Sequence, residues 1–435
     1  RSPPLLSLSS LPKYPSGVSL SISSTRNAMD DSDDDGDDEG SKLCPSGRVY
    51  VYDLPSEFNA ELLRSCSSLV PWTDMCPSLD NNGVGISVDM PFWMGGTGFW
   101  FLTSQFGGEV IFHSRLLLHP CRTMDPQKAS AFFIPFYTGL DIARYLFAPA
   151  GSTPSQRDEL SHGLLDWLKQ QETWKRRNGR DHFLMVGRIT WDFRRESSGG
   201  WLWRKLWPRS AGGWGNDLFL TTEMERGPLR LIIEKSISDK QEMAVPYPTS
   251  FHPRSSSDVA KWQEIVRSSR RTLLFSYAGG PRSQFQNDFR SVLLDQCRDS
   301  SPSECRSMDC SDQKCEHPLA VMELFLDSVF CLQPRGDSFT RRSIFDAMIA
   351  GCIPVFFWKR TAYLQYQWHL PSQTVPDSYS VFIDRAEVRS GKRIRDVLLG
   401  FSEKKVRRMR ETLIASIPRL VYALPSSSSV NFLST

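Results

Sequence analysis

The segment CLQPRGDSFTRRSIFDAMIAGCIPVFF, residues 331–357, places a polar loop and a helix-like stretch between two apolar runs. The apolar runs predict buried strands, and residues 340–351 predict a helix that ends at Gly351. The buried face of this helix is expected to consist of Ile344, Ala347 and Met348. A strand, a loop, a helix and a second strand in immediate succession indicate a parallel α/β sheet.

The same pattern recurs along the rest of the chain. Further apolar runs that predict strands lie at residues 49–52, 129–137, 182–187, 270–282 and 328–336. Apolar residues at helical spacing occur at residues 103–119 and 319–327. Short apolar strands that alternate with helices predict the α/β fold class.

The length of the chain favours more than one domain. A chain of 435 residues exceeds the usual domain size of about 100 to 200 residues. Residues 1–42 are rich in Ser, Pro and Asp without apolar periodicity, which predicts a flexible stem. Three prolines in residues 245–253 mark a boundary. We therefore predict an N-terminal domain at residues 43–250 and a C-terminal domain at residues 251–435, with a cleft between them.

Charge is distributed unevenly over the sequence. Eight acidic groups lie in residues 30–39, so the remainder carries about +11, against a net charge of +3 for the whole chain. A basic body suits a phosphate-bearing or polyanionic ligand, although a solvated basic surface accounts for it equally well. The acidic run predicts disorder rather than a metal site. Because the basic residues are dispersed and no nucleic-acid-binding module is present, nucleic acid is not an expected partner.

The ten cysteines point to disulfides. Four of them, Cys297, Cys305, Cys310 and Cys315, are separated by seven, four and four residues. Zinc sites favour two close pairs with a longer loop between them, so these even gaps indicate a loop held by disulfides. Disulfides imply an oxidising compartment such as the secretory pathway. The sequence contains no Asn-x-Ser/Thr motif, so N-glycosylation gives no further support for a secretory compartment.

No apolar run reaches the roughly 18 to 20 residues that a membrane-spanning helix requires. The sequence begins at Arg1 rather than Met, which leaves an upstream anchor or signal open.

The loop within the opening segment predicts an anion site. In a parallel sheet, ligands bind beyond the carboxyl ends of the strands, where helices begin. We expect Ser338 or Thr340 to cap the helix, and Gly336 to let the backbone approach a ligand closely. With the planar guanidinium of one or two arginines, such a loop favours a phosphate or diphosphate. The alternative is a capped helix with surface arginines.

A second loop is expected at the same sheet edge. The sequence YAGGPR follows a predicted strand and supplies Gly279, Gly280 and Arg282. Neither loop matches the phosphate-binding motif of nucleoside triphosphatases or the complete dinucleotide fingerprint.

Five segments of the chain resemble the plant branch of the exostosin-like glycosyltransferases. They are the opening segment, AFFIPFYTGLDIARYL (131–146), GRDHFLMVGRITWDFRR (179–195), VPYPTSFHP (245–253) and AYLQYQWHLP (362–371). The sequence is most similar to the xyloglucan galactosyltransferase group, and the resemblance extends over residues 47–424. It implies a GT-B fold, with two Rossmann-like domains facing a cleft and the nucleotide sugar on the C-terminal one. It also implies a type II Golgi membrane protein whose anchor, absent from this chain, precedes a luminal stem.

The resemblance implies that the polar loop of the opening segment, called the opening loop below, binds the diphosphate of a UDP-sugar. The residues that carry this expectation are Gly279, Ser338, Thr340, Arg341 and Arg342, with Arg282 as a second phosphate contact and Arg335 as a weaker candidate. Asp346 resembles the acidic residue near the donor ribose. Its alternative role is a surface ion pair with Arg342, four residues earlier.

An inverting transfer needs a general base that removes the proton from the attacking hydroxyl group. Asp192 is the first candidate because it follows a predicted strand, and Asp141 and His182 are the others. Asp141 has a local ion pair with Arg144 as its alternative role. We expect no metal cofactor, because arginines and the helix dipole can balance the leaving diphosphate.

The resemblance implies transfer of galactose from UDP-galactose to a xylose side chain of xyloglucan, possible partners being other Golgi glycosyltransferases. Alternatives are a UDP-galacturonic acid or pentose donor, the former requiring a further cation such as Arg195 or Arg360. A catalytically silent polysaccharide-binding subunit of a Golgi synthase complex is a different class of alternative. The tryptophan-rich residues 199–217 offer aromatic side chains for sugar stacking, or for packing beneath a loop.

Overall fold

The computed structural model describes residues 44–146, 152–195, 214–281, 288–311, 315–371 and 375–424. The predicted stem at residues 1–42 lies outside these ranges. All the described residues belong to one compact unit that contains two parallel sheets. The predicted α/β class with two Rossmann-like sheets is therefore confirmed, whereas the division at residue 250 stays a prediction.

The first sheet has six parallel strands in the order β2-β1-β3-β4-β5-β6. Its strands are β1 (Arg48–Val51), β2 (Arg122–Thr123), β3 (Ala129–Phe133), β4 (His182–Ile189), β5 (Leu229–Glu234) and β6 (Glu242–Ala244). The sequence predicted β1, β3 and β4, and it missed the other three.

The second sheet has five parallel strands in the order β11-β10-β9-β7-β8. Its strands are β7 (Leu273–Ala278), β8 (Cys305–Met308), β9 (Ser328–Gln333), β10 (Ile353–Phe356) and β11 (Val381–Phe382). In both sheets the first strand in chain order lies between the second and the third. This is the doubly wound order, in which the connections reverse direction between the first and third strands.

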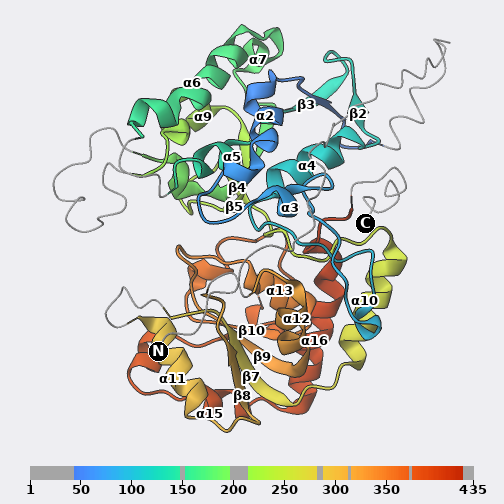
Figure 1. Cartoon of the computed structure of the whole chain (residues 1–435), viewed down its shortest axis with the longest axis vertical. Helices are drawn as coiled ribbons and strands as arrows, with labels where there is room; N and C mark the ends of the chain where they lie inside the picture. The colour runs from blue at the N-terminus through green and yellow to red at the C-terminus, as the bar shows by residue number, and fades with distance from the viewer. Residues whose placement is uncertain are drawn as a thin grey trace, which may run out of the picture. The chain divides into compact units, whose positions relative to one another are not determined.

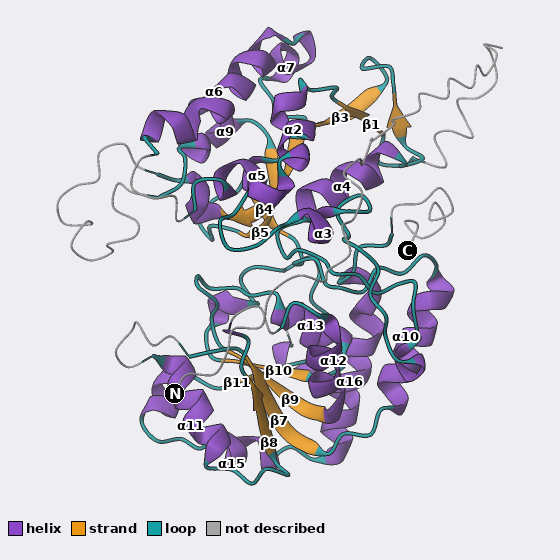
Figure 2. Cartoon of the chain, viewed as in Figure 1, coloured by secondary structure: helices purple, strands orange, loops and turns teal. Residues whose placement is uncertain are grey.

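Helices cover both faces of the second sheet (Figures 1 and 2). On one face are α10 (Ser256–Ser268), α12 (Pro318–Asp327), α13 (Ser343–Ile349) and α16 (Glu403–Ser416). On the other are α11 (Phe289–Arg298), α14 (Arg385–Arg389) and α15 (Ile394–Leu399). This coverage explains why β9 and β10 are almost wholly apolar, since both faces of each strand are buried.

Further helices accompany the first sheet (Figure 1). They are α2 (Ala60–Arg64), α3 (Cys76–Leu79), α4 (Gly108–Leu117), α5 (Thr138–Ala143), α6 (Pro154–Gln170), α7 (Glu172–Arg177) and α9 (Thr222–Arg226). The longest, α6, begins with a capping box in which Thr153 and Gln156 bond each other's backbone amides. In the described part of the chain, no helix combines the length and apolarity needed to cross a bilayer.

The helix within the opening segment is shorter than predicted. It begins at Ser343 rather than at residue 340, and no side chain caps its first turn. The expectation that Ser338 or Thr340 caps this helix is therefore wrong. Its end is as predicted, because Gly351 has φ of +65°, and Ile344, Ala347 and Met348 are fully buried.

All ten cysteines form disulfides. The pairs are Cys44–Cys121, Cys66–Cys76, Cys297–Cys305, Cys310–Cys315 and Cys331–Cys352. The predicted cysteine-rich loop is confirmed as two disulfides, and the zinc alternative fails because every thiol is consumed. The last pair joins Cys331 of β9 to Cys352, the residue that directly precedes β10.

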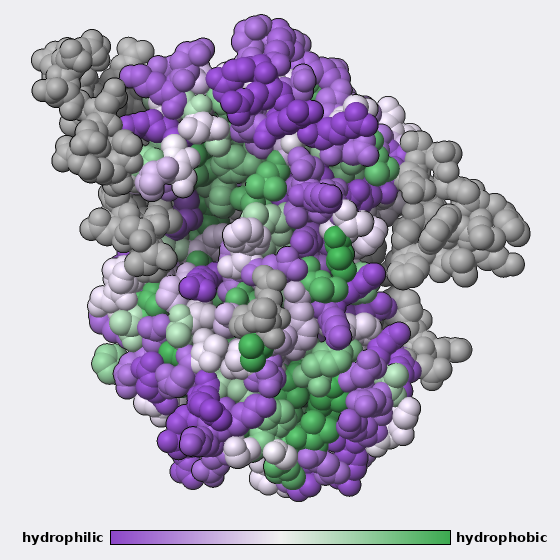
Figure 3. Space-filling view, turned by 180° about the vertical axis from the view of Figure 1, so that it is seen from behind, coloured by the Kyte–Doolittle hydropathy of each residue, from purple (hydrophilic) through white to green (hydrophobic). Residues whose placement is uncertain are grey.

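Polar side chains cover most of the surface seen in Figure 3, where apolar side chains gather in separate patches. Two aromatic side chains are unusually exposed, Phe92 at 96% and Trp368 at 73%. Large apolar side chains that face solvent beside a cavity often mark a binding surface.

Candidate functional site

The candidate site lies at the carboxyl ends of β7 and β9, the first and third strands of the second sheet in chain order. Ligands of doubly wound sheets bind at this switch point. The two loops that leave it are the two that the sequence predicted to meet, residues 278–281 and 334–342. At Gly279, with φ of +150°, an added Cβ would lie 2.6 Å from the Tyr277 hydroxyl oxygen and 3.1 Å from Arg341 Nη2. Only glycine allows this approach.

Arg341 is the cation at the switch point. Its Nη2 donates to the backbone carbonyl of Ala278 at 2.7 Å, and its guanidinium carbon lies 5.7 Å from the centre of the Tyr277 ring. Its Nη1 is buried and has no hydrogen-bond partner among the described residues. Burial lowers the pKa of Arg341 from its ordinary value. A buried guanidinium with an unused donor is suited to an anionic ligand.

Arg342 has a different environment. Its Nη1 donates to the carbonyl of Thr103 at 2.6 Å, its Nη2 to the hydroxyl of Ser250 at 2.7 Å, and its Nε lies 3.3 Å from Asp346. All three nitrogens are therefore engaged by the protein. Burial raises the pKa of Asp346, while the charge of Arg342 opposes the rise. These two residues form the ion pair that the sequence offered as the alternative, but Asp346 is buried rather than at the surface.

Ser338 and Thr340 bind a carboxylate of the first sheet. Glu234, the last residue of β5, accepts hydrogen bonds from the hydroxyl groups of Ser338 and Thr340, the latter at 2.7 Å. It also accepts from the backbone amides of Phe339 at 3.0 Å and Thr340 at 2.7 Å. Burial raises the pKa of Glu234, and these hydrogen bonds act in the opposite direction. Glu234 thus holds the shape of the opening loop.

Sequence reasoning missed Glu234. Glu234 is the last residue of β5, a strand that the sequence did not predict, whereas Asp192 lies three residues beyond the end of the predicted β4. Tyr247 was missed as well, and its hydroxyl oxygen lies 2.9 Å from Thr340 Oγ1. Gly336 is required by the loop itself rather than by a ligand, because an added Cβ would lie 2.1 Å from the carbonyl oxygen of Thr340.

Asp192 lies just beyond β4, in the short helix Thr190–Phe193. One carboxylate oxygen accepts from Trp214 Nε1 at 2.8 Å, and the other lies 3.5 Å from Arg188 Nη1. Burial raises the pKa of Asp192, while the charge of Arg188 lowers it. The charge of Asp192 acts on Tyr247, whose pKa is raised chiefly by burial. The negative charge of Asp192 thus contributes to the raised pKa of Tyr247, whose hydroxyl group is bonded to Thr340.

Asp141 and His182 differ from Asp192 in position. Asp141, in α5, forms the predicted alternative ion pair with Arg144, and burial raises its pKa to about 6. His182 begins β4, so it lies at the opposite end of that strand from Asp192. Its ring nitrogens lie 2.8 Å from Asp181 Oδ1 and 2.7 Å from the Tyr52 hydroxyl oxygen. We assign His182 to the core, since both nitrogens are engaged away from the carboxyl edge.

Other expected residues have definite positions or lie outside the described ranges. Arg282 and most of the tryptophan-rich segment lie outside, and of that segment Trp214 onward is described. Arg195 is buried against Asp158 and donates to the carbonyl of Gly215 at 3.1 Å, so it is no free cation for a uronic acid. Arg360 is exposed, and its guanidinium carbon lies 5.3 Å from the ring centre of Phe339 in the opening loop.

The arrangement combines a buried cation at the second sheet with buried acidic groups at the first. Arg341 can neutralise an anionic ligand, and Asp192 can accept a proton, because its raised pKa makes it a stronger base than an ordinary aspartate. Ile189 and Glu234 are paired residues of β4 and β5, which brings the ends of these strands together. Such a site can activate a hydroxyl group beside an anionic leaving group.

Comparison with known proteins identifies the family of the chain. The model of the exostosin GT47 domain matches residues 43–398. Xyloglucan galactosyltransferase XLT2 of Arabidopsis thaliana is 49% identical over 387 residues, which cover 87% of this chain and 71% of that relative. Xyloglucan galactosyltransferase MUR3 of the same plant is 42% identical, over 88% of this chain and 60% of its own. A xyloglucan-specific galacturonosyltransferase is 41% identical, over 87% of this chain and 54% of its own.

Proposed function

Because the chain belongs to the exostosin GT47 family of glycosyltransferases, we propose that it transfers galactose from UDP-galactose to a side-chain xylose of xyloglucan. Its two parallel sheets have the GT-B arrangement of this family. The names of two of the relatives above support galactose as the sugar and xyloglucan as the acceptor.

The observation that carries the proposal is the buried guanidinium of Arg341 at the switch point, with Nη1 unused by the described residues. In the proposed complex this nitrogen donates to the diphosphate of the donor. Arg282 supplies a second contact, and Ser338 and Thr340 act through the loop that Glu234 holds in shape. No metal is part of the proposal, because arginine can balance the charge of the leaving diphosphate.

The proposed reaction is a single displacement with inversion. The acceptor hydroxyl oxygen forms a bond to the anomeric carbon while the bond from that carbon to the diphosphate oxygen breaks. The electron pair of the broken bond leaves with UDP, whose developing charge Arg341 stabilises. Asp192 takes the proton of the acceptor hydroxyl group. General-base catalysis of this kind contributes about 10²- to 10⁴-fold to the rate.

A second candidate donor is UDP-galacturonic acid. One relative, at 41% identity, is a galacturonosyltransferase, and Arg360 is an exposed cation beside Phe339 of the opening loop. Arg360 would pair with the carboxylate of the sugar, so Arg360→Ala should reduce the use of this donor more than the use of UDP-galactose.

We place the proposed enzyme in the lumen of the Golgi apparatus, with an anchor that precedes this sequence and other glycosyltransferases as possible partners. Five disulfides support an oxidising compartment.

The test combines binding with turnover. Titration calorimetry with UDP comes first, followed by assays with UDP-galactose and UDP-galacturonic acid on xyloglucan oligosaccharides. Binding of UDP with turnover of UDP-galactose to a β-linked product supports the proposal. Turnover of UDP-galacturonic acid but not of UDP-galactose would make galacturonic acid the transferred sugar. A folded protein that does not bind UDP would refute the proposed donor site.

A further inference from the structure

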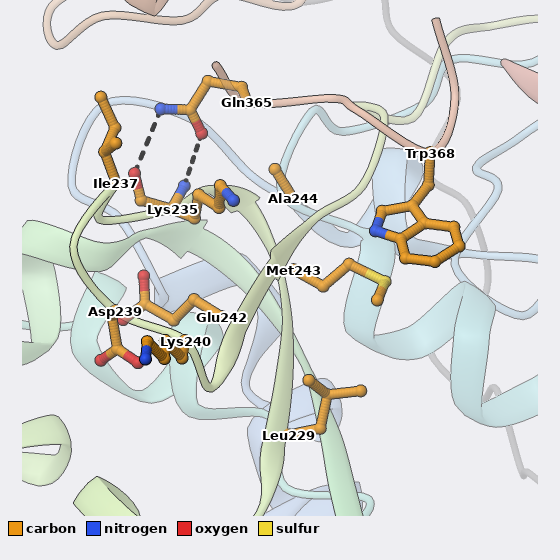
Figure 4. Close-up of a pocket in the computed structure, with 10 residues that line it drawn as sticks. All are labelled: Leu229, Lys235, Ile237, Asp239, Lys240, Glu242, Met243, Ala244, Gln365 and Trp368. Atoms are coloured by element: carbon orange, nitrogen blue, oxygen red, sulfur yellow. Dashed lines mark hydrogen bonds between the residues drawn. The ribbon is translucent and has the colours of Figure 1, made fainter.

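A cavity of about 350 Å³ borders the end of β5 without belonging to the donor site. Its walls come from β5, the edge strand β6, the turn between them, and the segment that contains Gln365 and Trp368 (Figure 4). Cavities of about 300 to 1,000 Å³ accommodate small ligands or single sugar units. One of its lining residues is Lys235, which directly follows Glu234, so this part of the cavity adjoins the candidate site.

The walls of this cavity are tied together by hydrogen bonds. The side-chain amide of Gln365 accepts from Lys235 N at 2.9 Å and donates to Lys235 O at 3.1 Å (Figure 4). The hydroxyl group of the next residue, Tyr366, donates to the carbonyl of Ile233 at 2.7 Å. The segment from Gln365 is therefore fixed to β5 on both sides of Glu234, and a ligand in the cavity would be held at a defined position relative to the opening loop.

Trp368 gives the cavity an aromatic wall. Its side chain is 73% exposed, although an indole is among the largest apolar groups a protein can bury. Figure 4 shows the thioether of Met243 extending toward the indole, from the middle of β6. A rigid, flat apolar surface of this kind fits the face of a pyranose ring, where the C–H bonds of the sugar gather.

The acidic side chains of the cavity are bonded within the protein. Asp239 is bonded to Arg194 and Arg230, and Glu242 is bonded to Arg194 and Thr190. Both carboxylates are therefore already neutralised.

The two lysines of the cavity differ from these carboxylates. In the described ranges, the ammonium groups of Lys235 and Lys240 have no ion pair. They can donate to hydroxyl oxygens of a saccharide chain that lies in the cavity. Figure 4 shows Lys240 beside Asp239, on the opposite side of the cavity from Trp368.

We propose that this cavity is a subsite for the acceptor polysaccharide, in which one backbone pyranose lies against the indole of Trp368 and Lys235 and Lys240 donate hydrogen bonds to the same saccharide chain farther along the cavity. The inference rests on the proposed function for the identity of the polysaccharide. It adds a binding site on the first sheet for a sugar other than the one that reacts. Because Lys235 directly follows Glu234, which binds the opening loop, a chain bound here lies near the loop at which the reacting side chain would meet the donor.

The test compares Trp368→Ala with Trp368→Phe, which retains an aromatic ring. Trp72→Ala is the matched control, because Trp72 is 48% exposed and does not line the cavity. Binding of a xyloglucan oligosaccharide is measured by titration in the presence of UDP, and KM for the same oligosaccharide is measured with UDP-galactose. UDP affinity is measured for each variant. An oligogalacturonide serves as an acidic saccharide probe.

We expect Trp368→Ala to weaken oligosaccharide binding and raise KM about tenfold or more, with unchanged UDP affinity. Trp368→Phe should recover most of the loss, and Trp72→Ala should change neither value by more than about twofold. Undiminished oligosaccharide binding by Trp368→Ala overturns the subsite, as does tight binding of the oligogalacturonide alone. Trp368-dependent oligosaccharide binding without galactose transfer supports the subsite while refuting the proposed function.

Discussion

Replacing Arg341 by alanine should increase the Kd for UDP substantially and have a smaller effect on the stability of the folded protein. Among the described residues, Arg341 donates to the Ala278 carbonyl at 2.7 Å, and its buried Nη1 has no hydrogen-bond partner. A hydrogen bond that involves a charged group contributes about 1.5 to 3 kcal/mol. Loss of one such bond to the diphosphate corresponds to an increase in the Kd for UDP of about ten- to 150-fold.

Arg342 provides the comparison, because its three side-chain nitrogens are engaged by Thr103, Ser250 and Asp346. Arg342→Ala leaves the buried Asp346 without its cation, so it should lower the melting temperature more than Arg341→Ala does. Arg341→Lys keeps the charge but not the planar group of donors, and should fall between wild type and Arg341→Ala in UDP affinity.

Titration calorimetry with UDP and thermal unfolding of the same preparations give both quantities. Unchanged UDP affinity in a folded Arg341→Ala protein would refute the assignment of this guanidinium to the diphosphate. An Arg342→Ala protein that loses UDP binding without any loss of stability would contradict the contrast drawn from the hydrogen bonds.

Three further changes test other parts of the site. Asp192→Asn should reduce kcat by about 10²-fold or more and leave the affinity for UDP unchanged. In the wild-type protein, kcat should rise with pH through a pKa above that of an ordinary aspartate. Retained turnover in the variant would show that another residue is the general base. Glu234→Gln replaces an acceptor of the opening loop by a donor, so both UDP affinity and melting temperature should fall, whereas unaltered UDP binding would remove Glu234 from the support of the site. Burial raises the pKa of Glu109 from an ordinary 4.5 to about 8, so the folded state holds a proton that the unfolded chain releases, and stability should fall by up to about 1.4 kcal/mol per pH unit as pH rises between these values. Glu109→Gln should flatten this dependence in melting curves, and an identical slope in both proteins would refute it.

The sequence predicted β1, β3, β4, β7, β9 and β10, each of which contains an apolar run, but it missed the four-residue β8 and the six-residue β5, although β5 is also apolar. It also missed β2, β6 and β11, which have two or three residues and lie at or near a sheet edge. Strands this short carry no periodicity of their own, and their pairing depends on neighbours that are distant in sequence.

The sequence likewise predicted the positions of some side chains of the candidate site and not of others. The sequence identified the opening loop and the glycine of the second loop, because turn residues and arginines that directly follow a buried strand are typical of a ligand-binding sheet edge. It could not distinguish Arg341 from Arg342, whose partners Thr103 and Ser250 are remote in the chain. It also retained His182 as one of three candidates for the general base, because a histidine in a motif gives no indication of which end of a strand it will occupy.

By itself, the sequence determined the α/β class, the family and the loop that leads from β9 to α13, because apolar runs and turn residues specify local structure. Tertiary structure alone decided which loops meet at the switch point, that Glu234 binds Ser338 and Thr340, and that Gln365 fixes Trp368 beside the end of β5. The physical reason is that the parallel order of strands sets which carboxyl ends become neighbours. Contacts between residues more than 100 positions apart in the chain leave no periodic signal in it.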